Sequence, residues 1–209
     1  MSIVDSQVRT NIVERVKRIC MSPDAEWTAI DAESASTSTL ISGYVVPLAA
    51  VSAVAAFIGQ SLIGVSLRFT GTTYRVPVGS GLVVAVLSVA LAAVAVVACA
   101  FIIDALAPKF GAQKNSMQAM KVAAYAPTPA WVAGVLQILP ALGILALVGA
   151  LYALYLLYLG LPRLMKCPAD KAVGYTVVVV LCVIVIAFVA GAVSTMFLVN
   201  PLTPGVLVQ

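Results

Sequence analysis

The sequence contains no histidine and few charged residues, with 12 Lys or Arg and 8 Asp or Glu among 209 residues. Without histidine the chain lacks the commonest general base and the commonest ligand of transition metals. The four cysteines, Cys20, Cys99, Cys167 and Cys182, show no CxxC spacing, which argues against disulfides and a zinc site. The sequence also lacks a glycine-rich phosphate loop before a Lys-Ser or Lys-Thr pair, and a serine with an evident base. We therefore expect no enzyme, no bound metal and no cofactor.

Apolar residues dominate instead: 62% of the chain is hydrophobic, and the mean hydropathy is +1.10. A soluble domain of this size is less apolar, so the composition indicates a membrane protein. The Lys and Arg residues sit singly beside apolar runs and form no basic stripe with interleaved aromatics, so we expect no nucleic-acid partner. The first 43 residues carry ten of the charges, so we expect the first apolar run to remain as an anchor and not to be a signal peptide.

The 33 residues 129–161 carry no formal charge. A single straight helix of this length would be roughly 50 Å long at about 1.5 Å per residue, whereas the bilayer hydrocarbon is roughly 30 Å thick. Pro140 removes a helix hydrogen bond, and Gly143 tolerates a sharp reversal. The stretch therefore predicts a helical hairpin over 129–165 that turns between residues 140 and 143.

The apolar runs together predict an all-α membrane protein with five transmembrane helices and an N-terminal amphipathic helix. We expect an interfacial N-terminal segment at 1–43, a five-helix domain at 44–199 and a short extracytoplasmic tail at 200–209. The connections between helices, among them 107–126, are expected to be loops. The five spans are expected at about 44–67, 78–106, 129–142, 143–165 and 172–199.

The distribution of Lys and Arg predicts the orientation in the membrane. With five spans and a cytoplasmic N-terminus, ten of these residues lie inside and two, Arg68 and Arg75, lie outside. If 129–161 were one tilted span, the division would be seven to five. Because cytoplasmic loops carry an excess of Lys and Arg, the five-span arrangement is favoured. We expect a multi-pass protein of the cell inner membrane with a cytoplasmic N-terminus and an extracytoplasmic C-terminus.

Residues 4–20 place Val8, Ile12, Val16 and Ile19 at steps of three and four, with charged residues on the other faces. This pattern predicts an amphipathic helix on an anionic leaflet. The alternative is a helix that packs on the cytoplasmic loops of the protein itself. The residues expected at the membrane surface are Arg9, Arg15, Lys17, Arg18 and Trp27.

The loops at 104–125 and 163–175 should meet on the cytoplasmic face. Asp104 is the only carboxylate at or near membrane depth, and we expect Lys121 or Lys171 to pair with it. Two interpretations stay open: a binding site for an ion, a lipid headgroup or a partner, or a set of anchors that locks the hairpin to its neighbours. The residues in this predicted cluster are Asp104, Lys121, Tyr125, Thr128, Lys166, Asp170, Lys171 and Tyr175.

Several strings resemble the bacterial branch of the Yip domain family: SPDAEW at 22–27, YVVPLAA at 44–50, LAPKFG at 106–111, YAPTPAWVAG at 125–134 and LYALYLLYLGLPRLMKCPADKAVGYTVV at 151–178. The resemblance covers most of residues 20–190. Eukaryotic members of the family are five-span proteins of the Golgi and endoplasmic reticulum that interact with Rab GTPases. The resemblance implies five spans with a cytosolic N-terminus, and a role in membrane organisation, trafficking or partner binding.

We therefore expect a non-enzymatic integral membrane protein that organises membrane or binds partners. The expected partners are the lipid bilayer, anionic lipid headgroups, and other membrane proteins or further copies of the chain. The alternative is a transporter or channel for a small solute or ion that works as an oligomer. Pro140, Gly143 and Pro162 favour this alternative, because interrupted helices commonly line transport cavities.

Overall fold

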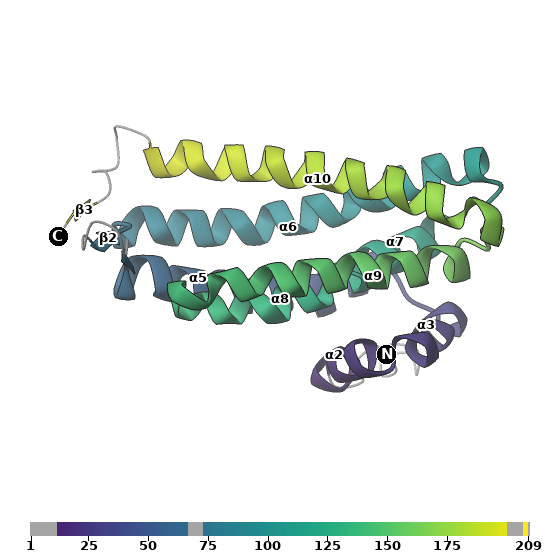
Figure 1. The fold of residues 1–209 in the computed structure, drawn as a ribbon, viewed down its shortest axis with the longest axis horizontal. Coiled ribbons are helices and arrows are strands. Elements are labelled where there is room, and N and C mark those ends of the chain that lie inside the picture. The colour runs from purple at the N-terminus through teal and green to yellow at the C-terminus, as the bar shows by residue number, and fades with distance from the viewer. Residues whose placement is uncertain (1–11, 67–72, 200–206, 209) are drawn as a thin grey trace.

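The structure, a computed structural model, describes residues 12–66, 73–199 and 207–208. Long helices run side by side, a small sheet lies at one end, and two short N-terminal helices lie beside the bundle toward its other end (Figure 1). The N-terminal helices are α2 (Ile12–Met21) and α3 (Pro23–Ala32). This arrangement separates the N-terminal helices from the strands.

The bundle is built from segments of unequal length. The first consists of α4 (Thr37–Leu40), the π-helical turn η1 (Ile41–Val45), α5 (Val46–Phe57) and the π-helical turn η2 (Ile58–Ile63). The second is α6 (Val78–Leu106), followed by the 3₁₀ turn η3 (Ala107–Phe110). The remaining elements are α7 (Ser116–Tyr125), α8 (Thr128–Gly134), η4 (Val135–Ile138), η5 (Pro140–Leu145), α9 (Ala146–Leu164) and α10 (Ala169–Val199).

Four helices within the described residues are long and apolar enough to cross a membrane: Thr37–Ile63, Val78–Phe110, Pro140–Leu164 and Ala169–Met196. They correspond to four of the five predicted spans. Their outer surfaces are strongly apolar, with large exposed side chains such as Phe101 and Phe188. The remaining predicted span, 129–142, contains only the short helix α8 and the 3₁₀ turn η4 before the chain reverses.

The predicted reversal in the uncharged stretch is present. The chain turns at Leu139, whose extended backbone separates η4 from η5. On either side of the turn, α8 and α9 pack closely: a methyl group added at Gly149 would lie 2.4 Å from Cβ of Ala133 and 2.6 Å from the carbonyl oxygen of Pro129. Pro140 begins the returning segment, but Gly143 has no positive φ. Proline therefore marks the turn, and the conformational freedom of Gly143 is not what permits it.

The loop prediction for 107–126 is wrong in its second half, because Ser116–Tyr125 forms α7 and most of its side chains are buried. The loop that remains lies against the end of α9, where the backbone N–H of Gln113 donates to the carbonyl oxygen of Met165 at 2.7 Å.

Helix α9 begins at the end of the bundle opposite to this loop, so the chain between Phe110 and Pro140 must run along the length of the bundle. It does so through α7, α8 and η4, each of which is too short to span a membrane alone.

Three short strands form an antiparallel sheet that the sequence did not predict. The strands are β1 (Val65–Ser66), β2 (Thr73–Arg75) and β3 (Leu207–Val208), in the order β1-β2-β3. Val65 pairs with Tyr74, and Tyr74 pairs with Val208. Strands of two or three residues are too short to show a period of two, so no sequence pattern indicated them. The sheet holds a part of the C-terminal tail beside the connection between η2 and α6.

The apolar face predicted for the membrane surface packs on the protein instead. Ile19 is fully buried, and Ile12 and Val16 pack against the hydrophobic core. The bundle supplies an apolar surface that this face of α2 covers, so burial against protein takes the place of burial in lipid. The structure thus matches the alternative in which the helix packs on the protein itself, for residues 12–21. Residues 4–11 of the predicted helix lie outside the described residues.

Candidate functional site

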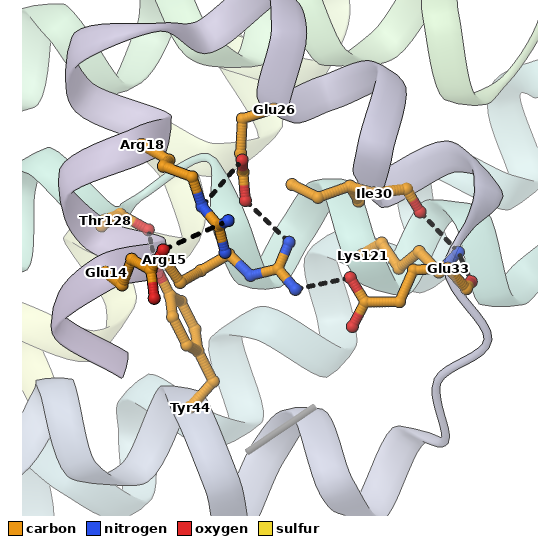
Figure 2. A network of polar contacts seen from close by, with 9 residues as sticks. All are labelled: Glu14, Arg15, Arg18, Glu26, Ile30, Glu33, Tyr44, Lys121 and Thr128. Atoms are coloured by element: carbon orange, nitrogen blue, oxygen red, sulfur yellow. Dashed lines mark hydrogen bonds and ion pairs between the residues drawn. The ribbon is translucent and has the colours of Figure 1, made fainter. Parts of the chain in front are cut away.

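A network of charged side chains, the Arg15 network, joins α2 to α3 (Figure 2). Arg15 forms two ion pairs: Nη1 lies 2.8 Å from Oε1 of Glu26, and Nη2 lies 2.6 Å from Oε2 of Glu33. Arg18 adds a second cation, with its Nε 3.3 Å from Oε2 of Glu26 and its Nη1 3.5 Å from Oε1 of Glu14. The network therefore consists of the side chains of Glu14, Arg15, Arg18, Glu26 and Glu33.

The centre of the Arg15 network is buried, with Arg15 only 7% and Glu26 only 4% exposed. The Arg15 guanidinium also lies over the ring of Tyr125 on α7, 5.4 Å from the ring centroid, in a cation–π contact. Burial alone lowers the pKa of Arg15, but the charges of its neighbours Tyr125, Glu33 and Glu26 outweigh burial and raise it. The guanidinium therefore remains charged and holds both α2 and α3 to the bundle.

Lys121 on α7 makes a second link to the N-terminal helices. This side chain is 3% exposed, and its Nζ donates to the carbonyl oxygens of Ile30 at 2.8 Å and Glu33 at 2.5 Å. These carbonyls lie at the C-terminal end of α3, where the last carbonyl groups lack their ordinary helical partners. The Ile30 carbonyl also accepts from the backbone N–H of Glu33 at 3.3 Å. A lysine ammonium is well suited to cap such an end. Lys121 thus anchors α3 through its backbone.

Beneath the network, a hydroxyl pair ties α7 and α8 to the segment that precedes α5. Thr128 Oγ1 donates to the carbonyl oxygen of Tyr125 at 2.6 Å and lies 2.8 Å from the hydroxyl of Tyr44. Because Thr128 has one hydroxyl hydrogen, the Tyr44 hydroxyl is the donor in the second bond. The rings of Tyr44 and Tyr125 also meet edge to face, with centroids 4.7 Å apart. The predicted residues Lys121, Tyr125 and Thr128 therefore belong to one buried site.

The end of α9 completes the contact with α3. Trp27 is fully buried against Gly160, Arg163 Nη2 lies 2.5 Å from Oδ1 of Asp24, and Lys166 pairs with Asp31. The last two pairs are partly exposed, so they contribute little stability. The buried contacts therefore carry most of the attachment.

The predicted membrane-surface residues divide into two groups. Arg15 and Trp27 are enclosed by protein in this structure. Lys17 is exposed on α2, and Arg18 is partly exposed. Arg9 lies outside the described residues. Only Lys17 and Arg18 among the described members of this set are available to a lipid surface.

The eight residues of the predicted cluster do not meet at one point. Lys121, Tyr125, Thr128 and Lys166 contact the N-terminal helices or support them, whereas the others lie where α6 meets α10. There, the Tyr175 hydroxyl donates to the carbonyl oxygen of Ile103, and its ring stacks on Phe110 with centroids 5.0 Å apart. The remaining members of this second group are Asp104, Asp170 and Lys171.

Asp104 does not pair with Lys121, because Lys121 donates to the carbonyls of α3. Oδ1 of Asp104 is buried and has no hydrogen-bond partner among the described residues. Asp170 and Lys171 are exposed in the first turn of α10. Among the described residues, Asp104 therefore forms no ion pair with either predicted partner, Lys121 or Lys171.

The acidic members of the site, Glu26 and Glu33, and the hydroxyl donor Tyr44 are not among the residues predicted from the sequence. Glu26 lies on α3, and Glu33 follows its last residue, seven positions and about two helical turns further along the chain. That spacing was the available signal. No group of three His, Cys, Asp or Glu residues in the described part of the chain could hold a metal ion.

A family model described as the Yip1 domain matches residues 17–191. The chain belongs to the Yip1 family. The Yip1 match includes Glu26, Trp27, Lys121 and Gly160, and it begins just after Arg15. Together with its long apolar helices, the Yip1 domain makes this chain an integral membrane protein. No curated protein and no solved structure matches the chain.

Proposed function

We propose that this Yip1-family chain is a five-span protein of a bacterial inner membrane, with its N-terminus in the cytoplasm. The fifth crossing in this proposal is the composite segment of α7, α8 and η4. Support comes from the exposed cations Lys109, Lys114 and Lys166, which follow α6 or α9 at the end that faces the N-terminal helices. Arg75 lies at the opposite end, on β2. This asymmetry follows the positive-inside rule.

Its role in this proposal is that of a non-enzymatic scaffold that organises membrane or binds partner proteins. The observation that carries the proposal is the fixed attachment of α2 and α3 by the buried Arg15 network. On its outward side α2 carries Val13, 71% exposed, Lys17, and Met21, 73% exposed. These residues are four apart and share one face of the helix. We call this face the α2 stripe; an apolar face with a central cation suits an anionic leaflet or a membrane-protein partner.

Site-specific photo-crosslinking in native membranes tests the scaffold proposal. A photoreactive residue in place of Lys17 should form adducts with lipid or with a membrane protein. The matched control is Ala29, an exposed residue of α3 outside the stripe, where adducts should be few. Equal adduct formation at both positions, or none at Lys17, would contradict a role for the α2 stripe.

The alternative, a transporter or channel working as an oligomer, draws on the buried Oδ1 of Asp104, which has no hydrogen-bond partner within the described ranges. Ionisable groups at membrane depth commonly mark ion pathways. Purified protein in liposomes separates the two functions. The scaffold proposal predicts no solute-specific flux. Solute-specific flux that Asp104→Asn abolishes would overturn the scaffold function and support the transporter function.

A further inference from the structure

Two cavities with some polar lining residues lie at the strand end of the bundle, away from the N-terminal helices. The inner cavity, about 310 Å³, lies between α5, η2, α6 and η4. The outer cavity, also about 310 Å³, lies between η2, β2 and η5. Both are lined by Gln60 and Gln137, so the two cavities meet at these amides. At about 30 Å³ per water molecule, each has room for a group of roughly ten non-hydrogen atoms.

Three polar side chains of the inner cavity, those of Gln60, Ser61 and Gln137, can bind a ligand. The Ser61 hydroxyl, on a residue 7% exposed, has no hydrogen-bond partner among the described residues. Buried hydroxyls nearly always have a hydrogen-bond partner, so the Ser61 hydroxyl is suited to bond to a ligand in the cavity. Gln60 and Gln137 add two amides, each with donors and an acceptor. The cavity is therefore suited to a neutral group rich in hydroxyls.

Close-packed backbone borders the inner cavity. Gln60 and Ser61 lie in the π-helical turn η2, a form that occurs often at functional sites. Close packing surrounds the turn: a methyl group at Gly59 would lie 1.9 Å from the carbonyl oxygen of Gln137, and one at Gly81 would lie 2.2 Å from Oγ of Ser61. The cavity thus persists beside tightly packed backbone.

Arg75 gives the outer cavity its charge. It lines that cavity, and its Nε donates to the carbonyl oxygen of Ile63 at 3.4 Å. The sequence contains no Asp or Glu between Glu33 and Asp104, so no carboxylate neutralises Arg75 from its own part of the chain. An arginine in this position favours a phosphate, which its planar guanidinium can bind through two hydrogen bonds. The same lack of carboxylates disfavours a ligand with an ammonium group.

The surroundings of the outer cavity favour a ligand with an apolar part. Leu62, which lies in η2 with Gln60, is 52% exposed, and Leu139, which follows η4, is 51% exposed. Ile144, beside Gly143, is 72% exposed. Acyl chains can cover these side chains in a bilayer.

We propose that the two cavities bind the headgroup of an anionic phospholipid, with the phosphate at Arg75 and the headgroup hydroxyls at Gln60, Ser61 and Gln137. A phosphatidylglycerol has this chemistry. The shared chemistry, a phosphate ester of a small polyol, also occurs in soluble form as glycerol phosphate. This binding goes beyond the scaffold role and does not depend on the α2 stripe.

Native mass spectrometry of the purified full-length chain in detergent tests the proposal. The chain should retain phosphatidylglycerol at least tenfold more tightly than phosphatidylcholine. Arg75→Gln, and separately Gln60→Leu with Gln137→Leu, should each lower the affinity for phosphatidylglycerol by tenfold or more, whereas Arg75→Lys should retain most of it. The matched control is Lys114→Gln, which removes one exposed cation at the other end of the bundle and should change nothing.

The outcomes separate the possible ligands. Binding of glycerol phosphate that excludes phosphatidylglycerol would support the cavity chemistry and overturn its lipid source. Equal retention of the two phospholipids, or affinities that none of the cavity variants changes, would overturn the proposal. Thermal melting of each variant identifies any that fails to fold, and Arg75→Gln, at the edge of the bundle, then remains the decisive variant.

Discussion

Trp27 of α3 lies directly over Gly160 of α9, and this contact leaves no room for a side chain at the glycine. A methyl group at Gly160 would lie 2.8 Å from Cζ2 of Trp27 and 2.9 Å from Cε2. An added methyl group at these distances would overlap the indole, and a buried indole cannot move aside without moving the helix that carries it. The N-terminal helices therefore owe their close attachment to the absence of one Cβ atom.

Gly160→Ala should loosen α3 from the bundle. With Trp131 replaced by Phe, so that Trp27 is the only tryptophan, its fluorescence emission should shift to longer wavelength as the indole meets water. The matched control is Gly191→Ala, where an added methyl group has no atom within 4 Å. That control should leave the emission unchanged, and α10 should gain slightly in helix propensity. An unshifted spectrum for Gly160→Ala would show that the contact is not needed.

Arg15→Met should destabilise the protein strongly, because Glu26 and Glu33 would lose their buried cation. Removal of one partner from a buried ion pair costs about 3–5 kcal/mol. Arg18→Met should cost at most about 1 kcal/mol, since Arg18 is partly exposed and its ion pairs are longer. Thermal melting in detergent compares the two variants. Similar losses for both would contradict the central position of Arg15 in the network.

Lys121→Met should remove the ammonium that donates to the carbonyl oxygens of Ile30 and Glu33. The Ile30 carbonyl keeps the backbone N–H of Glu33 as a donor, whereas the Glu33 carbonyl loses its buried partner. A buried polar group that loses its partner costs about 1–3 kcal/mol. Lys166→Met removes an exposed cation that pairs with Asp31, and it should cost at most about 1 kcal/mol. Limited proteolysis within α3 measures the effect, and cleavage should be faster for Lys121→Met. If Lys166→Met were the more sensitive variant, the capping role of Lys121 would be refuted.

Cys20 should react slowly with alkylating reagents. Burial raises the pKa of its thiol above the ordinary value of 9.0, and only the thiolate is a strong nucleophile. Because the raised pKa reduces the thiolate fraction at any given pH, the labelling rate should reach its midpoint at a higher pH than in the unfolded chain. A variant with Cys99, Cys167 and Cys182 changed to Ala isolates this thiol. A midpoint equal to that of the denatured protein would contradict the expectation.

The five-span topology predicts which ends of the bundle face the same side of the membrane. In a variant without other cysteines, Lys114→Cys and Lys171→Cys should react with a membrane-impermeant reagent from the same side. Gly79→Cys, at the start of α6, should react from the opposite side; all three positions are exposed. Labelling of positions 114 and 171 from opposite sides would contradict a hairpin that crosses the membrane twice.

The sequence was sufficient for the long apolar helices because each is specified by its own composition. Residues 78–106, predicted as a span, form the helix α6 with those bounds. The reversal near Pro140 was also predictable, since an uncharged stretch of that length exceeds the membrane thickness and proline interrupts a helix locally. Residues 116–125, in contrast, form a helix within the predicted loop 107–126.

The candidate site was only partly predictable. Lys121, Tyr125 and Thr128 were selected for their types and their positions near the membrane, but their partners lie about 80 to 110 residues away in the N-terminal segment. The amphipathic pattern of α2 indicated an apolar face without indicating what covers it. Periodicity reports that a face will be buried, and a bilayer and a protein surface bury it equally well.

By itself, the sequence determined that this chain enters a membrane and that its uncharged middle folds back, because hydropathy and the local effect of proline act residue by residue. Only the tertiary structure decided that Arg15 and Trp27 face the protein, and that Ser61 faces a cavity. Those outcomes depend on which distant backbone approaches each side chain, and no local pattern carries that information.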